Sequence, residues 1–253
     1  MDGGENKVDK PVPLDPTAIA YLWMAVELNL NILIIGEGVN GLINFLAGFI
    51  LDYRTVLDLR DDSRSNGRIN YATLSAKSRD FRSIREKTIG IFPDRVIYET
   101  ENGHVNDIFA MSRYGISFMA AARCGPCNNL VKSLLSKQFG VSNSNIHMLD
   151  IAVWAGSSGT VSKITEYKWL DRAEMIANKD RLASKRYSNM LIMGYGRVYS
   201  ENLPESKVLK AYSRMNIVGK GGVRGELVAR KLFVEDAMMA GAPINPESYY
   251  DIR

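Results

Sequence analysis

The feature that most constrains the fold is a short, purely apolar run followed directly by glycines. Residues 32–35 (Ile-Leu-Ile-Ile) contain no polar position, which is typical of a strand buried on both faces of a parallel sheet. The glycine-containing segment 36–41 follows, and then an apolar stretch that predicts a helix over 42–50. Upstream, Asp15-Pro16 predicts the start of a helix over 17–29, because aspartate caps helices and proline favours the first helical position. Helix, buried strand, glycine loop and helix form the arrangement of a phosphate-binding βα unit.

Strand and helix patterns then alternate. The expected strands are 53–59, 95–98, 116–122 and 148–155, and the expected helices are 78–87, 105–113 and 128–139. This alternation predicts an α/β fold with a mostly parallel sheet flanked by helices on both faces.

From residue 157 the pattern changes. The expected elements are an antiparallel pair of strands over 161–169 and 190–199 with a polar helix between them, and C-terminal helices over 206–215 and 224–240. We therefore expect a flexible N-terminal arm over 1–15 and one domain over 16–253. Its core would span 16–156, and the antiparallel hairpin and C-terminal helices would span 157–253.

Composition excludes several classes of function. The net charge of +4 over 253 residues is spread along the chain, short of the dense basic face of a duplex-binding protein, so no nucleic-acid partner is expected. The first 15 residues lack the apolar segment of a secretory signal. The apolar stretch 32–51 contains Glu37, two asparagines and four glycines, which argues against a membrane span. We expect a cytoplasmic protein.

Several segments, in order, resemble one known family, the motor domain of type II/type IV secretion ATPases, and above all its archaeal pilus and archaellum assembly branch. The similar segments are Tyr21-Leu22-Trp23 with Glu27, the strand and loop over 32–41, Pro93-Asp94-Arg95-Val96-Ile97 (Walker B strand), Ala110-Met111-Ser112, Leu149-Asp150-Ile151-Ala152, and Glu226-Leu227 with Arg230, Gly241 and Tyr249-Tyr250. The series covers nearly the whole chain. It implies a RecA-like P-loop NTPase fold with a helical C-terminal region.

The departures from the family pattern fall on the chemistry. A Walker A loop reads G-x-x-x-x-G-K-[ST], in which the lysine neutralises phosphate charge and the hydroxyl binds Mg²⁺. The corresponding remnant is Gly36, Glu37, Gly38, Val39, Asn40, Gly41, Leu42 and Ile43. Leu42 and Ile43 replace the lysine and the hydroxyl residue, so the resemblance implies a pseudoenzyme. ATP and Mg²⁺ are expected only if this degenerate loop still binds them.

Other family positions are also altered. The Walker B strand should end in Gly-Glu, whereas this chain reads Glu99-Thr100-Glu101, so Glu99 and Glu101 are the remnant catalytic candidates. Segment 120–125, where the family has a histidine box, contains no histidine, and 90–92 contains no arginine. Asp58, Asp61 and Asp62 are candidates for the acidic box, without a fixed register.

Cys124-Gly-Pro-Cys127 matches a thiol-redox motif between an expected strand and helix. However, the next proline is Pro204, far from where a thioredoxin-like fold needs one. A local disulfide or two ordinary thiols is the preferred interpretation. No metal site is expected, because only His104 and His147 are available as histidine partners.

The resemblance implies an inactive subunit of a type II/IV secretion or type IV pilus-like machine. Its expected partners are an active secretion-ATPase paralogue, further copies of itself in a ring-like oligomer, or a membrane platform protein, through which it would lie at the inner face of the membrane. Three alternatives stay open: an atypical but active ATPase, a thiol-redox protein using Cys124 and Cys127, and a nucleotide-free scaffold of a mobile element or virus built on the same fold.

Overall fold

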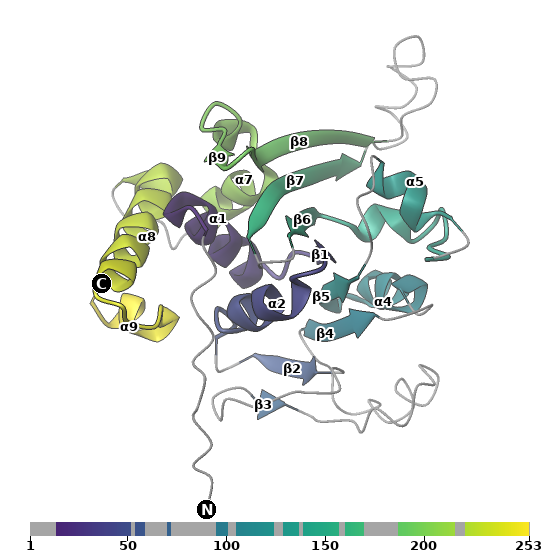
Figure 1. Cartoon of the computed structure of the whole chain (residues 1–253), viewed down its shortest axis with the longest axis horizontal. Helices are drawn as coiled ribbons and strands as arrows, with labels where there is room; N and C mark the ends of the chain where they lie inside the picture. Colours follow the sequence, from purple (N-terminus) through teal and green to yellow (C-terminus); the bar gives the residue numbers. More distant parts are fainter. Residues whose placement is uncertain are drawn as a thin grey trace, which may run out of the picture.

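A nine-stranded mixed sheet with helices on both faces forms the centre of the protein (Figure 1). The computed structural model describes residues 14–51, 54–58, 70–71, 95–100, 105–123, 129–136, 139–156, 160–169, 187–215 and 221–252. The strand order is β3-β2-β4-β5-β1-β6-β7-β8-β9. The first six strands in this order are parallel, and the last three extend the sheet in antiparallel fashion.

The strands are β1 (Ile32–Gly36), β2 (Thr55–Asp58), β3 (Asn70–Tyr71), β4 (Arg95–Thr100), β5 (Ser117–Ala122), β6 (Ile151–Ala155), β7 (Val161–Trp169), β8 (Tyr187–Gly194) and β9 (Arg197–Val198). The helices are α1 (Pro16–Glu27), α2 (Val39–Ala47), α4 (Val105–Met111), α5 (Leu130–Leu134), α7 (Lys207–Arg214), α8 (Gly222–Met239) and α9 (Pro246–Asp251), with 3₁₀ turns η1 (Ser112–Tyr114), η2 (Ile146–Met148) and η3 (Leu203–Glu205).

Strand β1 lies in the middle of the parallel part, between β5 and β6. Its side chains alternate between two apolar cores. Ile32 and Ile34 face the core formed with α1 and α2, whereas Leu33 and Ile35 face the core formed with α4 and α5. Because both faces are covered, every position from 32 to 35 must be apolar. This explains the uninterrupted apolar run.

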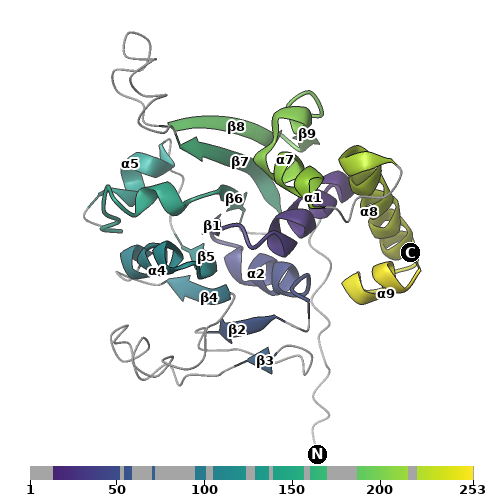
Figure 2. The ribbon, with the colours of Figure 1, turned by 180° about the vertical axis from the view of Figure 1, so that it is seen from behind.

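Helix α1 is apolar on all sides because it lies between two layers. Asp15 caps it by accepting hydrogen bonds from Thr17 and Ala18, and Pro16 is its first residue. Residues 18–26 are all buried, as expected for a helix enclosed by other elements. The sheet covers one side and α8 the other (Figure 2).

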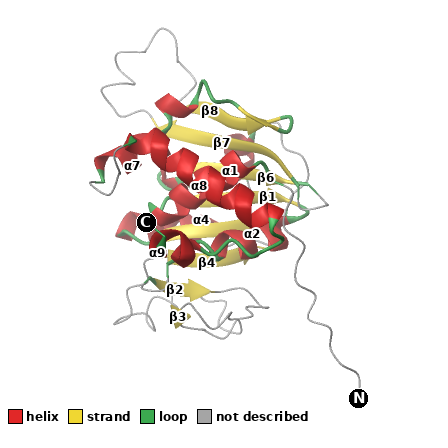
Figure 3. Ribbon diagram, turned by 90° about the vertical axis from the view of Figure 1, so that its left-hand side faces the viewer, coloured by secondary structure: helices red, strands yellow, loops and turns green. Residues whose placement is uncertain are grey.

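The three C-terminal helices lie on the same side of the sheet as α1. Helix α8 forms an outer layer over α1, and α9 follows it near the C-terminus (Figure 3). The antiparallel pairing of β7 with β8 confirms the predicted pair of strands. The segment expected to form a helix between them lies outside the described residues, as does 78–87.

Several predicted element boundaries were wrong. The strand expected over 190–199 is β8 and β9 with a turn at 195–196 between them, the helix expected over 128–139 is described only as the five residues of α5, and the strand expected over 148–155 begins at Ile151. The helix expected over 42–50 begins at Val39 and ends at Ala47, because Val39 is apolar and joins the core directly after the two-residue junction. Helix α9 was not predicted, although Asn245 caps it and Pro246 is its first residue. Its short length gave no periodic apolar pattern to detect.

Candidate functional site: the junction of β1 and α2

The junction between β1 and α2 is where a phosphate-binding loop was predicted. Gly36 ends β1 with a φ of 131°, a region that is costly for any residue with a side chain. A Cβ atom added at Gly36 would lie 1.8 Å from the carbonyl oxygen of Ala155 on the neighbouring β6. The packing of β1 against β6 alone therefore requires glycine at position 36.

Only Glu37 and Gly38 separate the strand from the helix. Gly38 is the N-cap residue of α2 and offers no side-chain hydrogen bond. Glu37 is exposed. Of the segment predicted to be a six-residue loop, the last three residues are helical, and Asn40 and Gly41 are exposed in the first turn of α2.

Leu42 and Ile43 are the residues that the family resemblance aligns with the Walker A lysine and hydroxyl residue. Both side chains are buried in the core that α2 shares with α1 and β1. Val39 is also fully buried there. These side chains are therefore committed to packing.

Of the other predicted site residues, Glu99 and Asp58 lie within parallel strands, near their carboxyl ends. Glu99 lies in β4 and pairs with Ala121 of β5, so one whole strand separates its position from β1. Asp58 is the last residue of β2. Glu101, Cys124 and Cys127 lie outside the described residues, as do Asp61 and Asp62.

Asn31 links the amino ends of the central strands, opposite the β1–α2 junction. Its side-chain oxygen accepts hydrogen bonds from Phe118 N (2.9 Å) and Ser112 Oγ (3.1 Å), and its Nδ2 donates to Met148 O (2.7 Å). Its backbone N–H donates to the carboxylate of Asp150 (2.9 Å), which also pairs with Lys207. This hub joins the starts of β1, β5 and β6. In the sequence, the only sign of this hydrogen-bonded hub was that a single polar residue, Asn31, precedes the apolar run 32–35.

Arg95, at the start of β4, is a fully buried cation. One guanidinium nitrogen donates to the carbonyl oxygens of Val26 (3.1 Å) and Leu30 (3.2 Å), at the end of α1. Burial, and then the neighbouring charge of Arg54, lower the pKa of Arg95 to about 9. The arginine thus ties the start of β4 to the C-terminal end of α1, where it supplies a further hydrogen bond to the carbonyl of Val26, which also accepts from Asn29 N.

Glu166 is a buried carboxyl group in the middle of β7. It accepts a hydrogen bond from the backbone N–H of Val208 (3.1 Å) in the first turn of α7, where Ser206 is the N-cap residue. Burial raises the pKa of Glu166, against the opposing effect of these backbone donors. Tyr21 of α1 lies beside it, and burial followed by the Glu166 charge raises the pKa of Tyr21.

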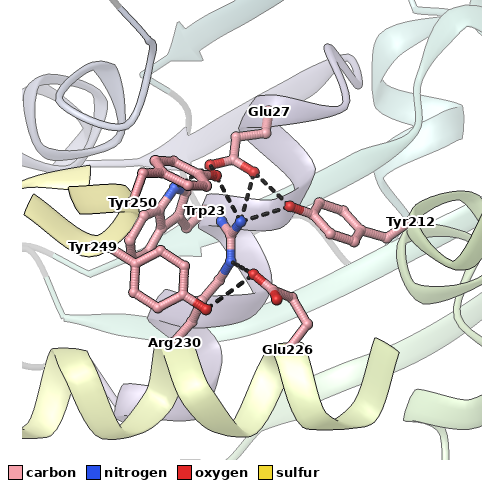
Figure 4. A network of polar contacts seen from close by, with 7 residues as sticks. All are labelled: Trp23, Glu27, Tyr212, Glu226, Arg230, Tyr249 and Tyr250. Carbon is pink, nitrogen blue, oxygen red and sulfur yellow. Dashed lines mark hydrogen bonds and ion pairs between the residues drawn. The ribbon is translucent and has the colours of Figure 1, made fainter. Parts of the chain in front are cut away.

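A second buried polar cluster, which we call the Arg230 cluster, joins α1, α7, α8 and α9 (Figure 4). It consists of Trp23, Glu27, Tyr212, Glu226, Arg230, Tyr249 and Tyr250. Arg230 is fully buried and pairs with Glu226 (Nε to Oε1, 2.8 Å) and Glu27 (Nη2 to Oε2, 2.8 Å).

Tyrosine hydroxyls complete the Arg230 cluster. Arg230 Nη2 donates to the hydroxyls of Tyr212 (2.6 Å) and Tyr250 (2.8 Å), and both hydroxyls donate onward to Glu27. Tyr249 donates to Glu226 (3.0 Å). The guanidinium also lies 4.4 Å from the ring centre of Trp23, a cation–π distance.

The Arg230 cluster is electrostatically coupled. Burial raises the pKa of Tyr212 and of Tyr250, although the nearby Arg230 charge lowers it. Burial lowers the pKa of Arg230, but the hydrogen bond and charge of Glu27 outweigh this, so the net pKa is raised. All three groups therefore keep their protons at neutral pH. Glu226, Arg230, Tyr249 and Tyr250 were noted only through the family resemblance, and their mutual contact was not predicted.

Within the ranges that the structure describes, no group of three or more histidine, cysteine, aspartate or glutamate side chains is arranged to hold a metal ion. In the same ranges, no helix combines the length and apolar character needed to cross a membrane.

Comparisons with known proteins add a limited likeness. No protein-family model matches the sequence, and no curated protein matches it. Among solved structures, the chain is similar to the crystal structure of the VirB11 ATPase from the Brucella suis type IV secretion system in complex with sulphate. The TM-score is 0.47 and the sequence identity 17%, over 63% of this chain and 54% of that chain. The chain thus spans about half the length of that structure.

Proposed function

We propose that this chain is a catalytically inactive homologue of a secretion or pilus-assembly ATPase. It would be a pseudo-ATPase with a RecA-like scaffold that serves as a structural or regulatory subunit. The observation that carries the proposal is the β1–α2 junction, where a two-residue connection and two buried aliphatic side chains stand in place of a phosphate loop.

Phosphoryl transfer needs two things from this junction. Backbone N–H groups must surround the phosphates, and a lysine and a hydroxyl group must face the same space to neutralise charge and bind Mg²⁺. With the helix starting at Val39, the backbone is too short to encircle a phosphate group. Leu42 and Ile43 supply neither charge nor metal ligand. Removal of a single charge-stabilising group typically slows catalysis by about a hundredfold to a thousandfold, and here two are replaced.

The overall arrangement supports an origin from a nucleotide-binding fold. In open α/β sheets, ligands bind beyond the carboxyl ends of the strands, where the chain turns to opposite sides of the sheet. Strand β1, between β5 and β6, ends at such a point. The series of family-like segments in the sequence supports the more specific assignment to secretion ATPases.

A subunit of this kind would act by binding other proteins. The partners we propose are an active secretion-ATPase paralogue, other copies of this chain in a ring-like oligomer, and a membrane platform protein at the cytoplasmic face.

Calorimetric titration of the purified chain with ATP and Mg²⁺ tests the inactive site, with phosphate release measured in parallel. We expect no binding up to millimolar nucleotide and no turnover. A hydrolysing secretion ATPase in the same buffer is the positive control. Turnover that disappears in Glu99→Gln or Glu101→Gln would refute the proposal in favour of an active, atypical ATPase.

The assembly role needs a separate experiment. Co-expression with a hydrolysing secretion ATPase should give a complex that survives size-exclusion chromatography and alters that ATPase's turnover. A chain that neither binds nor changes the turnover of any such motor, nor binds a platform protein, would contradict the assembly role. The titration result would still stand by itself.

A further inference from the structure

Helix α8 buries charged side chains and exposes apolar ones. Its inner side places Glu226 and Arg230 against α1 and α9, both almost completely buried. Its outer side exposes Val228 (52%), Leu232 (53%) and Met239 (79%). Buried charge and exposed apolar side chains are the two informative exceptions to the usual pattern. In Figure 3, α8 is the outermost layer on its side of the sheet.

The exposed apolar residues of α8 share one regularly spaced side of the helix with two half-buried residues, Gly225 and Glu235. Gly225, Val228, Leu232, Glu235 and Met239, which we call the outer seam, follow one another at steps of three, four, three and four residues. This is the spacing by which two helices pack along a common seam. Over its 18 residues, α8 is about 27 Å long, enough for such packing.

Gly225 supports a partner helix on this side. Among the residues that the structure describes, a Cβ atom added at Gly225 would meet no atom within 4 Å, so the packing of these residues does not require glycine. Glycine inside a helix lowers helix stability. A glycine on the outer seam lets the backbone of another helix approach closely.

We propose that the outer seam binds the α8 helix of a second copy of this chain, in antiparallel orientation about a two-fold axis near position 230. In this register Val228 faces Leu232 of the second copy, and Gly225 faces its Glu235. Each apolar contact and each glycine contact then occurs twice, as two-fold symmetry demands.

Charge decides the orientation. Glu235, the one charged member of the outer seam, pairs with Lys231 in its own helix (3.3 Å). In a parallel pair Glu235 would face Glu235 of the second copy, and like charges in contact disfavour association. In the antiparallel pair it lies beside Arg224 of the second copy, an opposite charge. This pairing does not depend on the fate of the nucleotide loop.

Sedimentation velocity over a concentration series tests the pairing. We expect the intact chain to form a dimer and Leu232→Glu to weaken it at least tenfold, because burial of a leucine contributes more than a factor of ten. Tyr195→Asp, at a residue 97% exposed in the β8–β9 turn, adds the same charge elsewhere and should leave the dimer intact. Gly225→Ala should weaken the dimer while raising the melting temperature of the monomer. A chain that stays monomeric at about 100 µM, which is roughly the largest dissociation constant expected for such a dimer, would overturn the proposal. A dimer that Leu232→Glu does not weaken would also overturn it.

Cysteine cross-linking tests the orientation, in a chain carrying Cys124→Ser and Cys127→Ser. A mixture of Arg224→Cys and Glu235→Cys chains should form a mixed disulfide, because these two positions lie side by side in the proposed register and both variants keep Gly225 and the apolar contacts. Each variant alone should not, because in the antiparallel register its two cysteines are ten or more residues apart, at least about 15 Å along the axis. Efficient cross-linking of either variant with itself would mean a parallel pair and would exclude the proposed geometry.

Discussion

Substitution of Arg230 by methionine should be among the most destabilising single changes in this protein. Methionine keeps much of the length of the side chain and its apolar stem, but removes the one cation of the Arg230 cluster. Glu27 and Glu226 would then share a buried site without a counter-charge, and the hydroxyls of Tyr212 and Tyr250 would lose their donor.

The expected cost follows from the burial of the pair. Removal of one partner from a buried ion pair costs about 3–5 kcal/mol, because the remaining charge is left uncompensated. A domain of ordinary stability has about 5–15 kcal/mol in total. At about 2–4 °C per kcal/mol for a chain of this size, the melting temperature should fall by about 6–20 °C.

Urea unfolding followed by far-ultraviolet circular dichroism measures this cost. Trp23 contacts the Arg230 guanidinium, so its fluorescence in a Trp154→Phe, Trp169→Phe background reports on the Arg230 cluster. The matched control is Lys231→Met, on the same helix. Lys231 is half-exposed and makes an i,i+4 pair with Glu235, which contributes about 0–1 kcal/mol. If Arg230→Met costs no more than Lys231→Met, the Arg230 cluster does not stabilise the docking of α8 and α9, and the reasoning is wrong.

Three further predictions concern single residues. Gly36→Ala should lower the free energy of unfolding by at least about 3 kcal/mol, because of the positive φ of this residue and its contact with β6. Gly41→Ala, at an exposed position, should leave it unchanged or raise it by up to about 1 kcal/mol. Chemical unfolding of both variants checks this, and equal effects would refute it. Glu166→Gln should flatten the pH dependence of stability: the raised pKa of Glu166 means that the folded chain holds a proton which the unfolded chain has lost, so wild-type stability should fall as pH rises above about 4.3 through the raised value. Melting curves from pH 4 to 8 that are parallel for the two proteins would contradict this. Asn31→Ala should cost about 2–4 kcal/mol, because it leaves buried hydrogen-bonding groups of β5 and η2 without partners, and hydrogen exchange at the start of β5 should accelerate.

The alternation of apolar runs and amphipathic segments was enough to predict the parallel sheet, because a strand that is buried on both faces must consist of apolar residues. The change of this pattern after residue 157 predicted an antiparallel pair of strands, which β7 and β8 form. Asp15-Pro16 predicted the start of α1 because its capping chemistry is local. These are properties of short windows of sequence.

The contacts that the sequence did not reveal are long-range. Glu27 meets Arg230 and Tyr250 across more than 200 positions, and no local pattern indicates which buried charges will meet. The length of the β1–α2 connection was also missed, because glycine spacing does not say where the helix begins. It depends on Val39 entering the core, which only the packing of α2 on α1 and β1 decides.

The two glycines that suggested a phosphate loop have different physical roles, and the difference bears on how such motifs are interpreted. Gly36 is required by the fold itself, since any side chain would strike the carbonyl of Ala155. This constraint persists whether or not a nucleotide binds. A Cβ atom added at Gly41 would meet nothing within 4 Å among the described residues, so their packing does not explain this glycine. A chain that has lost catalysis should therefore retain the first glycine and be free to change the second. A family-wide survey or a saturation library in which position 36 varies as freely as position 41 would contradict this division between packing and binding.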